Sequence, residues 1–273
     1  MKKVALVLGG GGSKAFSYLG AMDVFQKYGL KIDHIISSSS GSLMGILLAN
    51  QIPISKIKEE FYHRGRRWHW IKPSISRRSV ISQHRIRLIL KHLLPQQTIE
   101  NTAIPISIVA TNLNTVSTHI FSKGDAIIAV CASSSYPVLY KPILVDGKFL
   151  MADGGILNNL PADIAREIIG PENVVITLSA ASPFDESLEA LNTSTEIAYR
   201  IYYAPVEKLR NGIAQKYSDF VIEPFSHLKL GIRTWKDIFN FFHIKKLEEF
   251  YEFGKQAAEK NIKTILEKVQ SKS

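Results

Sequence analysis

Four consecutive serines, residues 37–40, stand directly before Gly41 and between two apolar stretches. A serine that attacks an ester projects from a tight turn between a strand and a helix, and this turn needs small residues two positions before and two positions after the nucleophile. Ser39 meets this requirement, because Ser37 precedes it and Gly41 follows it at that spacing. A serine-rich cap at a helix start, with no chemistry, has the same composition. The segment alone therefore leaves a nucleophile and a structural cap equally open.

Four glycines, residues 9–12, come earlier in the chain and are followed by Ser13 and Lys14. Consecutive glycines after a strand leave backbone N–H groups free to point at an anion. Such a loop suits a phosphate group or the oxyanion of an acyl-transfer reaction. A flexible turn that binds nothing has the same sequence, so the loop alone does not establish a site.

Three kinds of site compete for this glycine loop. Gly10, Gly12 and Ala15 fit the loose dinucleotide form G-x-G-x-x-A. That site also needs an acid at the end of the second strand, whereas Asp33 lies at its start. A phosphate-binding P-loop needs the order Gly-Lys-Ser/Thr, and the order here is Gly-Ser-Lys. An oxyanion hole needs a nucleophile on the neighbouring turn, where Ser39 is placed, and this is the function we favour.

A third turn, residues 153–155, has the sequence Asp-Gly-Gly and follows a short apolar run. A carboxylate at the end of a strand, with Gly154 and Gly155 behind it, can point along the sheet edge. The alternative is a turn aspartate that leads toward a helix starting near Pro161. On this segment alone the turn aspartate is the better interpretation.

The apolar runs around these turns have the lengths of buried strands and helices. Strand, glycine turn, helix, strand, tight turn and helix follow one another over residues 3–50, which is typical of parallel βαβ units. Ligands in such sheets bind beyond the carboxyl ends of the strands, where we expect the turns 9–13 and 37–41. The expected strands are 3–8, 33–36, 106–110, 118–121, 148–152 and 174–178, and the expected helices are 14–28, 40–50, 194–204 and 244–269, with 51–95 mostly helical.

The composition limits what else the chain can be. With 273 residues, 45% of them hydrophobic, it can bury a sizeable core, and no stretch has the composition of a linker. The single cysteine, Cys131, excludes an internal disulfide framework, and its apolar neighbours indicate a small buried side chain. The net charge of +10 favours polyanions, either nucleic acid or an anionic membrane face.

Together, the three turns resemble the motifs of patatin-like phospholipases. Residues 10–15, Gly-Gly-Gly-Ser-Lys-Ala, resemble that family's glycine-rich oxyanion motif. Residues 37–41 resemble its nucleophile elbow, and residues 153–155 resemble its catalytic aspartate motif. The motifs occur in the family's order, and the resemblance covers residues 4–180. We therefore expect one domain over 1–273, in which 181–273 supply completing helices and a strand.

The resemblance implies an α/β fold, a three-layer α/β/α sandwich with a mainly parallel central sheet. It also implies a Ser–Asp dyad without histidine, in which Asp153 accepts the proton of Ser39 as the serine attacks an ester carbonyl and forms an acyl-enzyme. The implied oxyanion hole comprises Gly10, Gly11, Gly12, Ser13 and Lys14, and the supporting glycines are Gly41, Gly154 and Gly155. No metal or cofactor is implied, and the implied substrate is a phospholipid or lysophospholipid.

Some residues depart from the family's pattern. Ser37 replaces the first glycine of the elbow, Ala15 replaces the last glycine of the oxyanion motif, and Lys14 stands where arginine is usual. These changes keep a second hypothesis open, a catalytically weak or inactive lipid-binding family member. His227 follows Asp153 in the chain and could complete a hydrolase triad, but the resemblance implies a dyad, so we expect a surface loop histidine.

Two segments, residues 63–72 and 232–243, combine cations with aromatic side chains. Trp and Phe beside Lys and Arg suit a lipid interface, and they also suit RNA, with bases stacked over a basic groove. A partly buried helix with a solvated charged face has the same composition. Beside the hydrolase motifs we favour lipid over nucleic acid. No apolar stretch approaches the ~20 residues of a membrane span, so we expect a cytoplasmic protein with peripheral contact to the inner face of the membrane through these segments.

Overall fold

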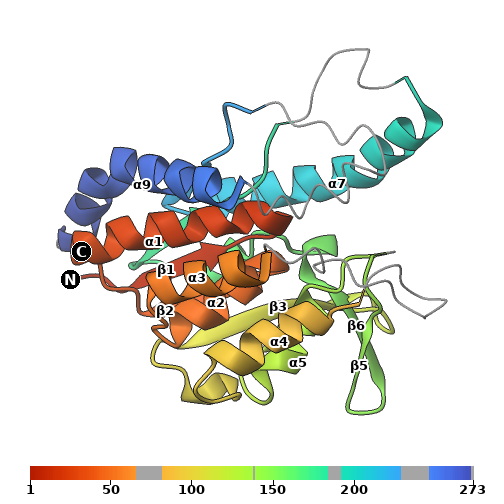
Figure 1. Ribbon diagram of the computed structural model, residues 1–273. Coiled ribbons are helices and arrows are strands. Elements are labelled where there is room, and N and C mark those ends of the chain that lie inside the picture. Colours follow the sequence, from red (N-terminus) through yellow and green to blue (C-terminus); the bar gives the residue numbers. More distant parts are fainter. Residues whose placement is uncertain (66–81, 138, 184–191, 229–245, 272–273) are drawn as a thin grey trace.

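The computed structural model describes residues 1–65, 82–137, 139–183, 192–228 and 246–271, which form an eight-stranded sheet (Figure 1). Its order is β5-β6-β3-β2-β1-β7-β8, and β4 pairs with β3. The strands are β1 Val4–Leu8, β2 His34–Ser38, β3 Ile106–Asn112, β4 Ser117–Phe121, β5 Ile143–Val145, β6 Phe149–Asp153, β7 Val174–Leu178 and β8 Phe220–Ile222. The five strands from β3 to β8 in this order pair in parallel, while β4, β5 and β6 pair antiparallel.

Helices cover both faces of the sheet. They are η1 Gly12–Phe16, α1 Ser17–Lys27, α2 Ser40–Ala49, α3 Ile54–Gly65, α4 His84–Leu93, η2 Ile99–Asn101, α5 Ala126–Ser133, η3 Gly154–Ile156, α6 Ala162–Ile169, α7 Ser194–Tyr217 and α9 Leu247–Gln270. Leu6 and Leu8 of β1 join a core with α1, α2, α5 and α9, whereas Ala5 and Val7 face α6 and α7. The predicted three-layer sandwich with a mainly parallel sheet is therefore confirmed.

Strand β3 is shared by three neighbours, and this arrangement sets the geometry of the site. A strand has one partner on each side, and β4 occupies one side of β3 from Ile108 to Asn112. The other side is therefore divided between β2, which pairs up to Val109, and β6, which pairs from Ala110 onward. Because β6 continues where β2 stops, Asp153 opposite Ala110 lies directly beyond the end of β2.

The expected strands and helices between residues 3 and 50 and between 106 and 178 are present, with ends that differ by a few residues. In the segment 51–95, expected to be mostly helical, α3 and α4 are present, and residues 66–81 lie outside the described residues. The helix expected over 194–204 was wrong at its end, because α7 continues through Pro205 to Tyr217. Proline removes one backbone donor from a helix, and packing of the following segment outweighs that cost. Ile213 and Tyr217, in the second half of α7, pack against the core under α6.

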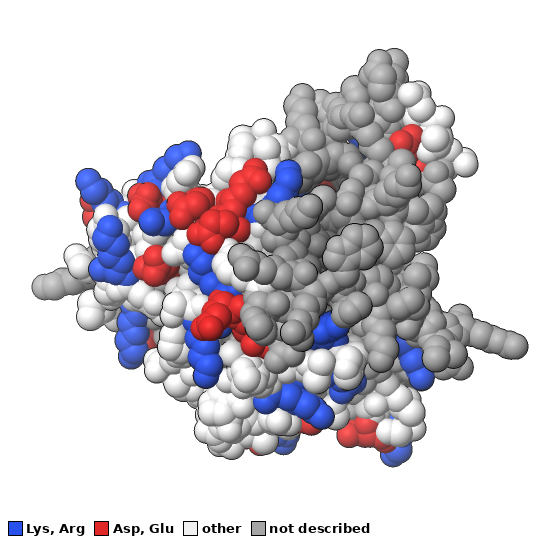
Figure 2. Space-filling view, in the orientation of Figure 1, with Lys and Arg blue, Asp and Glu red and all other residues white. Residues whose placement is uncertain are grey.

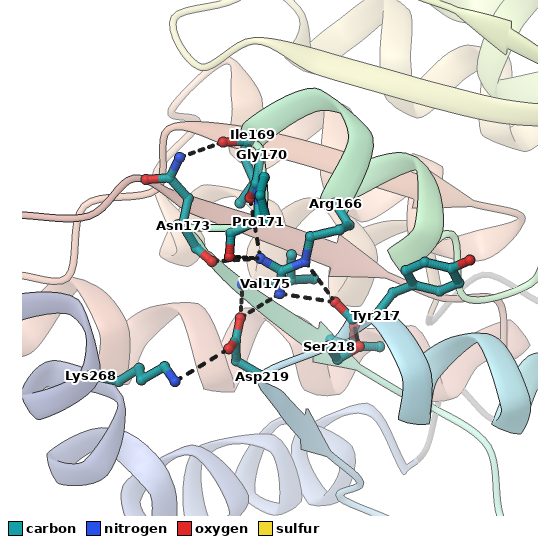
Figure 3. A network of polar contacts seen from close by, with 11 residues as sticks. Arg166, Ile169, Gly170, Pro171, Asn173, Val175, Tyr217, Ser218, Asp219 and Lys268 are labelled. Carbon is teal, nitrogen blue, oxygen red and sulfur yellow. Dashed lines mark hydrogen bonds and ion pairs between the residues drawn. The ribbon is translucent and has the colours of Figure 1, made fainter. Parts of the chain in front are cut away.

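The guanidinium of Arg166, in α6, ties the start of β7 to the end of α7 (Figure 3). It donates hydrogen bonds to the carbonyl oxygens of Asn173, at 2.6 Å, and Tyr217, at 3.1 Å. It also donates to the Asp219 carboxylate at 2.6 Å, and that carboxylate accepts a bond from the Val175 N–H at 2.9 Å. The chain after residue 180 is thus bonded to the sheet that carries the three motifs.

Charges of both signs lie side by side on the described part of the face that Figure 2 shows. The net charge of +10 is therefore not gathered there into one continuous basic stripe. Within the described residues, no helix combines the length and the apolar composition needed to cross a membrane. Most of the expected lipid-contact segments, 66–72 and 232–243, lie outside the described residues.

Candidate active site

Ser39 lies in a tight turn between β2 and α2, as the serine spacing predicts. Its backbone is in the left-handed half of conformational space, with φ of 54° and ψ of −132°, which is unfavourable for a residue with a side chain. Hydrogen bonds hold this turn: the Ser39 N–H donates to Ser133 Oγ at 2.8 Å, and the Ser39 carbonyl accepts from Ser134 Oγ at 2.9 Å. Gly41 is required here, because a Cβ at this position would lie 2.2 Å from the Leu8 carbonyl oxygen.

The side chains of Ser39 and Asp153 meet at the carboxyl edge of the sheet. Ser39 Oγ donates a hydrogen bond to Asp153 Oδ2 at 2.6 Å. The other carboxylate oxygen accepts a bond from the Gly155 N–H at 2.8 Å. The backbone of Asp153 is fixed as well, since its carbonyl accepts from Thr111 Oγ1 at 2.8 Å and its N–H donates to the Ser135 carbonyl at 3.1 Å. A serine and a carboxylate predicted from separate turns are thus placed in direct contact.

Burial raises the pKa of the Asp153 carboxyl to about 6, and the hydrogen bonds from Ser39 and Gly155 partly offset this rise. A carboxylate with an ordinary pKa holds a proton too weakly to act as an effective base near neutral pH. At about 6 the group is ionised at neutral pH and still basic enough to take the hydroxyl proton of a neighbouring serine. The buried position of Asp153 therefore makes its carboxylate more basic than that of an exposed aspartate.

The glycine loop lies against this pair, and two of its amides are bonded to side chains. The Gly10 N–H donates to Asn159 Oδ1 at 2.8 Å, and the Gly11 N–H donates to Ser40 Oγ at 2.9 Å. The next two N–H groups, of Gly12 and Ser13, begin η1, where a 3₁₀ helix offers its first amides no partner. Neither has an acceptor among the described residues. These two amides are therefore the part of the loop that is available to an anion.

The side chain of Lys14 contacts residues that follow β7 in the chain. Its ammonium donates to Ser182 Oγ at 3.0 Å and lies 5.4 Å from the centre of the Phe225 ring. Burial, with a smaller contribution from the nearby charge of Arg210, lowers the pKa of Lys14 to about 8. Lys14 thus joins the glycine loop to the chain that follows β7, rather than pointing away from the protein.

Asn159 is a site residue that the sequence analysis missed. A Cβ at Gly10 would lie 2.5 Å from Asn159 Oδ1 and 2.7 Å from Ser39 Cβ, and a Cβ at Gly155 would lie 2.9 Å from both Asn159 Oδ1 and Asp153 Oδ1. The amide therefore stands where the three motifs meet. An asparagine before Leu-Pro is common in turns, so its only signal was its place six residues after the aspartate.

Tyr136, Tyr202 and Tyr203 lie near the site and had no signal in the sequence. Tyr136, which follows α5, and Tyr203, in α7, are joined by a hydrogen bond between their hydroxyls, and their rings stack with centroids 6.5 Å apart. Burial is the main cause that raises the pKa of Tyr136, and the charge of Asp153 adds to it. The pKa of Tyr202 is raised in the same way, by burial and by the charge of Asp153. Aromatic side chains from α7 are thus close enough to the carboxylate to sense its charge.

The departures from the family's pattern are accommodated by neighbouring residues. Ser37 is fully buried, and Gly45 of α2 faces it, because a Cβ at Gly45 would lie 3.2 Å from Ser37 Cβ. Ala15 is buried in the main core. His227 lies in an exposed loop with its ring 4.9 Å from that of Phe253, as expected for a loop histidine. The two substitutions fill available space and leave the contact between Ser39 and Asp153 intact.

The chain is similar to several known proteins. It is 28% identical over 195 residues to mouse patatin-like phospholipase domain-containing protein 6, which covers 67% of this chain and 14% of that protein. It is 31% identical over 166 residues to an uncharacterized NTE family protein of Mycobacterium tuberculosis, covering 58% of this chain and 44% of that one. The chain thus spans less than half the length of these relatives.

Among solved structures, VipD from Legionella pneumophila superposes with a TM-score of 0.44 at 14% identity, covering 95% of this chain and 67% of VipD. ExoU in the ExoU–SpcU complex of Pseudomonas aeruginosa gives a TM-score of 0.41 at 15% identity, covering 99% of this chain and 52% of that one. The sequence description of the family "Patatin-like phospholipase" matches residues 6–166, which include all three motifs. The chain therefore belongs to the patatin-like phospholipase family.

Proposed function

We propose that the protein is a serine acyl hydrolase that cleaves carboxylic esters of phospholipids or lysophospholipids. The observation that carries this proposal is the 2.6 Å hydrogen bond from Ser39 Oγ to the buried carboxylate of Asp153. Membership of the patatin-like phospholipase family supports a lipid as the substrate. The names of the similar proteins from mouse and from Pongo abelii, both patatin-like phospholipase domain-containing protein 6, support the same class.

The reaction starts with proton transfer from Ser39 Oγ to Asp153 Oδ2, as the oxygen attacks the ester carbonyl carbon. The negative charge that develops on the carbonyl oxygen needs hydrogen-bond donors already in place. In this proposal the N–H groups of Gly12 and Ser13 supply them, while the bonded amides of Gly10 and Gly11 keep the loop in shape. Collapse of the tetrahedral intermediate breaks the ester bond, and the leaving alcohol takes the proton from Asp153.

The second half of the reaction repeats these roles with water. Asp153, ionised again, accepts a proton from a water molecule that attacks the acyl-Ser39 carbonyl. The same amides hold the second oxyanion. When the intermediate collapses, the fatty acid leaves and Ser39 Oγ regains a proton from Asp153. Each step needs one base and one set of donors, so a histidine is not required.

The proposal is tested by ester hydrolysis and by active-site labelling. Wild type should hydrolyse a p-nitrophenyl acyl ester series, and a fluorophosphonate probe should label Ser39. Ser39→Ala should lose both, and Asp153→Asn should lose at least two orders of magnitude in kcat/KM. Ser38→Ala is the matched control, because this neighbouring hydroxyl is buried and has no hydrogen-bond partner among the described residues.

Two outcomes would contradict the proposal. Activity that survives in folded Ser39→Ala would remove Ser39 from the reaction. A wild-type protein that hydrolyses no ester and takes no label would favour the alternative, an inactive lipid-binding member of the family. Circular dichroism of every variant separates loss of the dyad from loss of the fold.

A further inference from the structure

Four large apolar side chains stand exposed at the ends of two β-hairpins. The turn between β3 and β4 carries Leu113, 40% exposed, and Val116, 73% exposed. The hairpin of β5 and β6 carries Leu144, 60% exposed, and Phe149, 39% exposed. We call these four residues the hairpin tip. Exposed edge strands usually carry charged side chains, which prevent unwanted association, so apolar residues at this place need a reason.

The two turns of the hairpin tip lie side by side, because the two hairpins are bonded to each other, and Leu144 and Phe149 point to opposite faces of the β5–β6 ladder. The Leu113 N–H donates to the Leu150 carbonyl at 2.9 Å, and the Leu150 N–H donates to Asn114 Oδ1 at 2.7 Å. Leu150 in turn pairs with Leu144 across the β5–β6 ladder. The turn of the first hairpin is therefore attached to the strand that leads into the tip of the second.

The hairpin tip extends beyond the same sheet edge that holds Ser39. Strand β3 reaches this edge at Asn112, and the exposed turn follows at once. Strand β6 runs from the turn of its hairpin toward Asp153. Phe149, four residues before Asp153, therefore lies ~13 Å farther from the sheet edge along the strand. Figure 1 shows the β5–β6 hairpin projecting from the body of the protein.

Val116 is held in a conformation that its own side chain opposes. Its φ is 49°, in the left-handed region that Gly and Asn adopt with ease and β-branched residues avoid. The side chain is exposed, so burial does not compensate for this conformation. Neither feature is expected to stabilise the fold.

An exposed cation lies at the hairpin tip. Lys148 precedes Phe149 directly, with Asp146 as the acid of the same turn, whereas the exposed Lys141 lies at the other end of β5, level with Asp153 in the register of the ladder. The whole chain carries a net charge of +10. Apolar side chains that enter the acyl layer, with lysines at the depth of the phosphates, are the combination by which proteins attach to an anionic lipid surface.

We propose that the hairpin tip binds the surface of an anionic lipid bilayer and thereby brings Ser39 to its substrate at the interface. This proposal rests on the proposed lipid hydrolase function for its biological purpose, but the binding itself is measurable without catalysis. It also identifies a lipid-contacting surface separate from residues 63–72 and 232–243.

Flotation with vesicles tests the binding directly. The full chain with Ser39→Ala is used throughout, so that no lipid is consumed, with vesicles of phosphatidylcholine containing phosphatidylglycerol. Adding Leu144→Ser and Phe149→Ser together should lower the partition coefficient by about tenfold or more. Ile168→Ser is the matched control, because Ile168 is 42% exposed at the end of α6, at the edge of the sheet where β7 starts, and its loss should leave binding unchanged.

Val116→Asn separates an effect on stability from an effect on binding, because the proposal predicts that stability rises while vesicle binding weakens. Asparagine tolerates the left-handed backbone, so this variant should raise the midpoint of thermal unfolding. It should at the same time weaken vesicle binding, because an apolar contact is lost. A fall in both would show damage to the fold and would overturn the proposed role of Val116.

Hydrolysis measurements separate this proposal from the proposed function. For hydrolysis, Leu144→Ser and Phe149→Ser are introduced into the chain that keeps Ser39. These variants should hydrolyse a soluble short-chain ester at the wild-type rate and vesicle phospholipid more slowly. Tip-dependent vesicle binding by a chain that cleaves no ester would support the surface and sink the hydrolase. Ester cleavage with vesicle binding unaffected by the tip variants would overturn the surface alone. Light scattering that shows a dimer abolished by these variants, with vesicle binding unchanged, would also overturn it in favour of a protein interface.

Discussion

The side-chain oxygen of Asn159 accepts a hydrogen bond from the backbone N–H of Gly10 at 2.8 Å. This bond joins the loop that follows the aspartate to the loop of Gly12 and Ser13, whose amides have no acceptor among the described residues. The proposed oxyanion donors and the proposed base would therefore move together, since Asn159 is six residues after Asp153 in the same segment. An oxyanion hole is effective only when its donors are already in place.

Replacement of Asn159 by Leu should lower kcat/KM by about 10- to 100-fold, because the glycine loop loses the acceptor that positions it. The fold should lose about 1–2 kcal/mol, since a backbone donor is left without its partner. Steady-state kinetics on a soluble ester and urea unfolding measure the two effects. Asn158→Ala is the control, because Asn158 donates instead to Asp163 at 2.8 Å and should affect stability while leaving kcat/KM near wild type.

The activity should depend on the ionisation of Asp153. Because its pKa is raised to about 6, kcat/KM should rise with pH through about 6 and level off above it. A pH profile on a neutral soluble ester measures this. Activity that stays flat from pH 5 to pH 8 would mean that the carboxyl group of Asp153 does not act as the base.

The same pKa has a consequence for stability. The folded pKa of about 6 lies above the unfolded value of about 3.9, so the folded state holds the proton more tightly. Asp153 therefore costs nothing below pH 4 and destabilises the fold by about 3 kcal/mol above pH 6. Asp153→Asn should gain stability relative to wild type as the pH rises from 4 to 8. Thermal unfolding of both proteins across this range checks the sign, and a constant difference between them would contradict it.

Ser37 and Gly45 should be energetically coupled. In the wild-type background, Gly45→Ala places a Cβ 3.2 Å from Ser37 Cβ, so crowding cancels the gain expected from a better helix former. With Ser37→Gly, the added Cβ meets only the flexible end of Ile106, at 3.2 Å, so the same change should stabilise the protein by about 0.5–1 kcal/mol. A double-mutant cycle in urea measures this coupling. Additive effects would mean that the serine and the glycine do not share one space.

Arg166 should contribute more to stability than an ordinary surface cation. Arg166→Lys keeps the charge but loses the planar fork that reaches four carbonyl oxygens and Asp219, so we expect a loss of about 2–3 kcal/mol in free energy of unfolding. Lys268→Met removes only a half-exposed partner, 3.7 Å from Asp219, and should cost less than about 1 kcal/mol. Equal losses of free energy of unfolding in the two variants would show that the hydrogen bonds of the guanidinium add no stability beyond that of a surface ion pair.

Much of the fold could be predicted from the sequence, because short-range signals specify it. The apolar runs of β1, β2 and β7 are bounded by glycine or serine turns, and strands of this length are buried in parallel sheets. Ser39 and Asp153 became candidates only when the three turns were taken together, because each turn alone also fitted a structural role and the set resembles the motifs of patatin-like phospholipases.

The remaining features depend on contacts between segments that are distant in the chain. Nothing in the local sequence indicates that β3 passes from β2 to β6 at Ala110. The tie between Gly10 and Asn159 spans 149 residues, and the hydroxyl contact between Tyr136 and Tyr203 spans 67. The continuation of α7 through Pro205 is decided by packing under α6 rather than by local propensity. Such relationships become visible only in the folded chain.

One side of β3 pairs first with β2 and then with β6, and this arrangement limits where related chains can gain or lose residues. The spacing between the ends of β2 and β6 is fixed by successive residues of one strand, so a single inserted residue in β6 would turn the carboxylate of Asp153 to the opposite face of the sheet. An insertion at the Asp146–Gly147 turn would lengthen the hairpin and leave that register untouched. Evolution is therefore free to lengthen the hairpin, while the last few residues before the aspartate must keep their number.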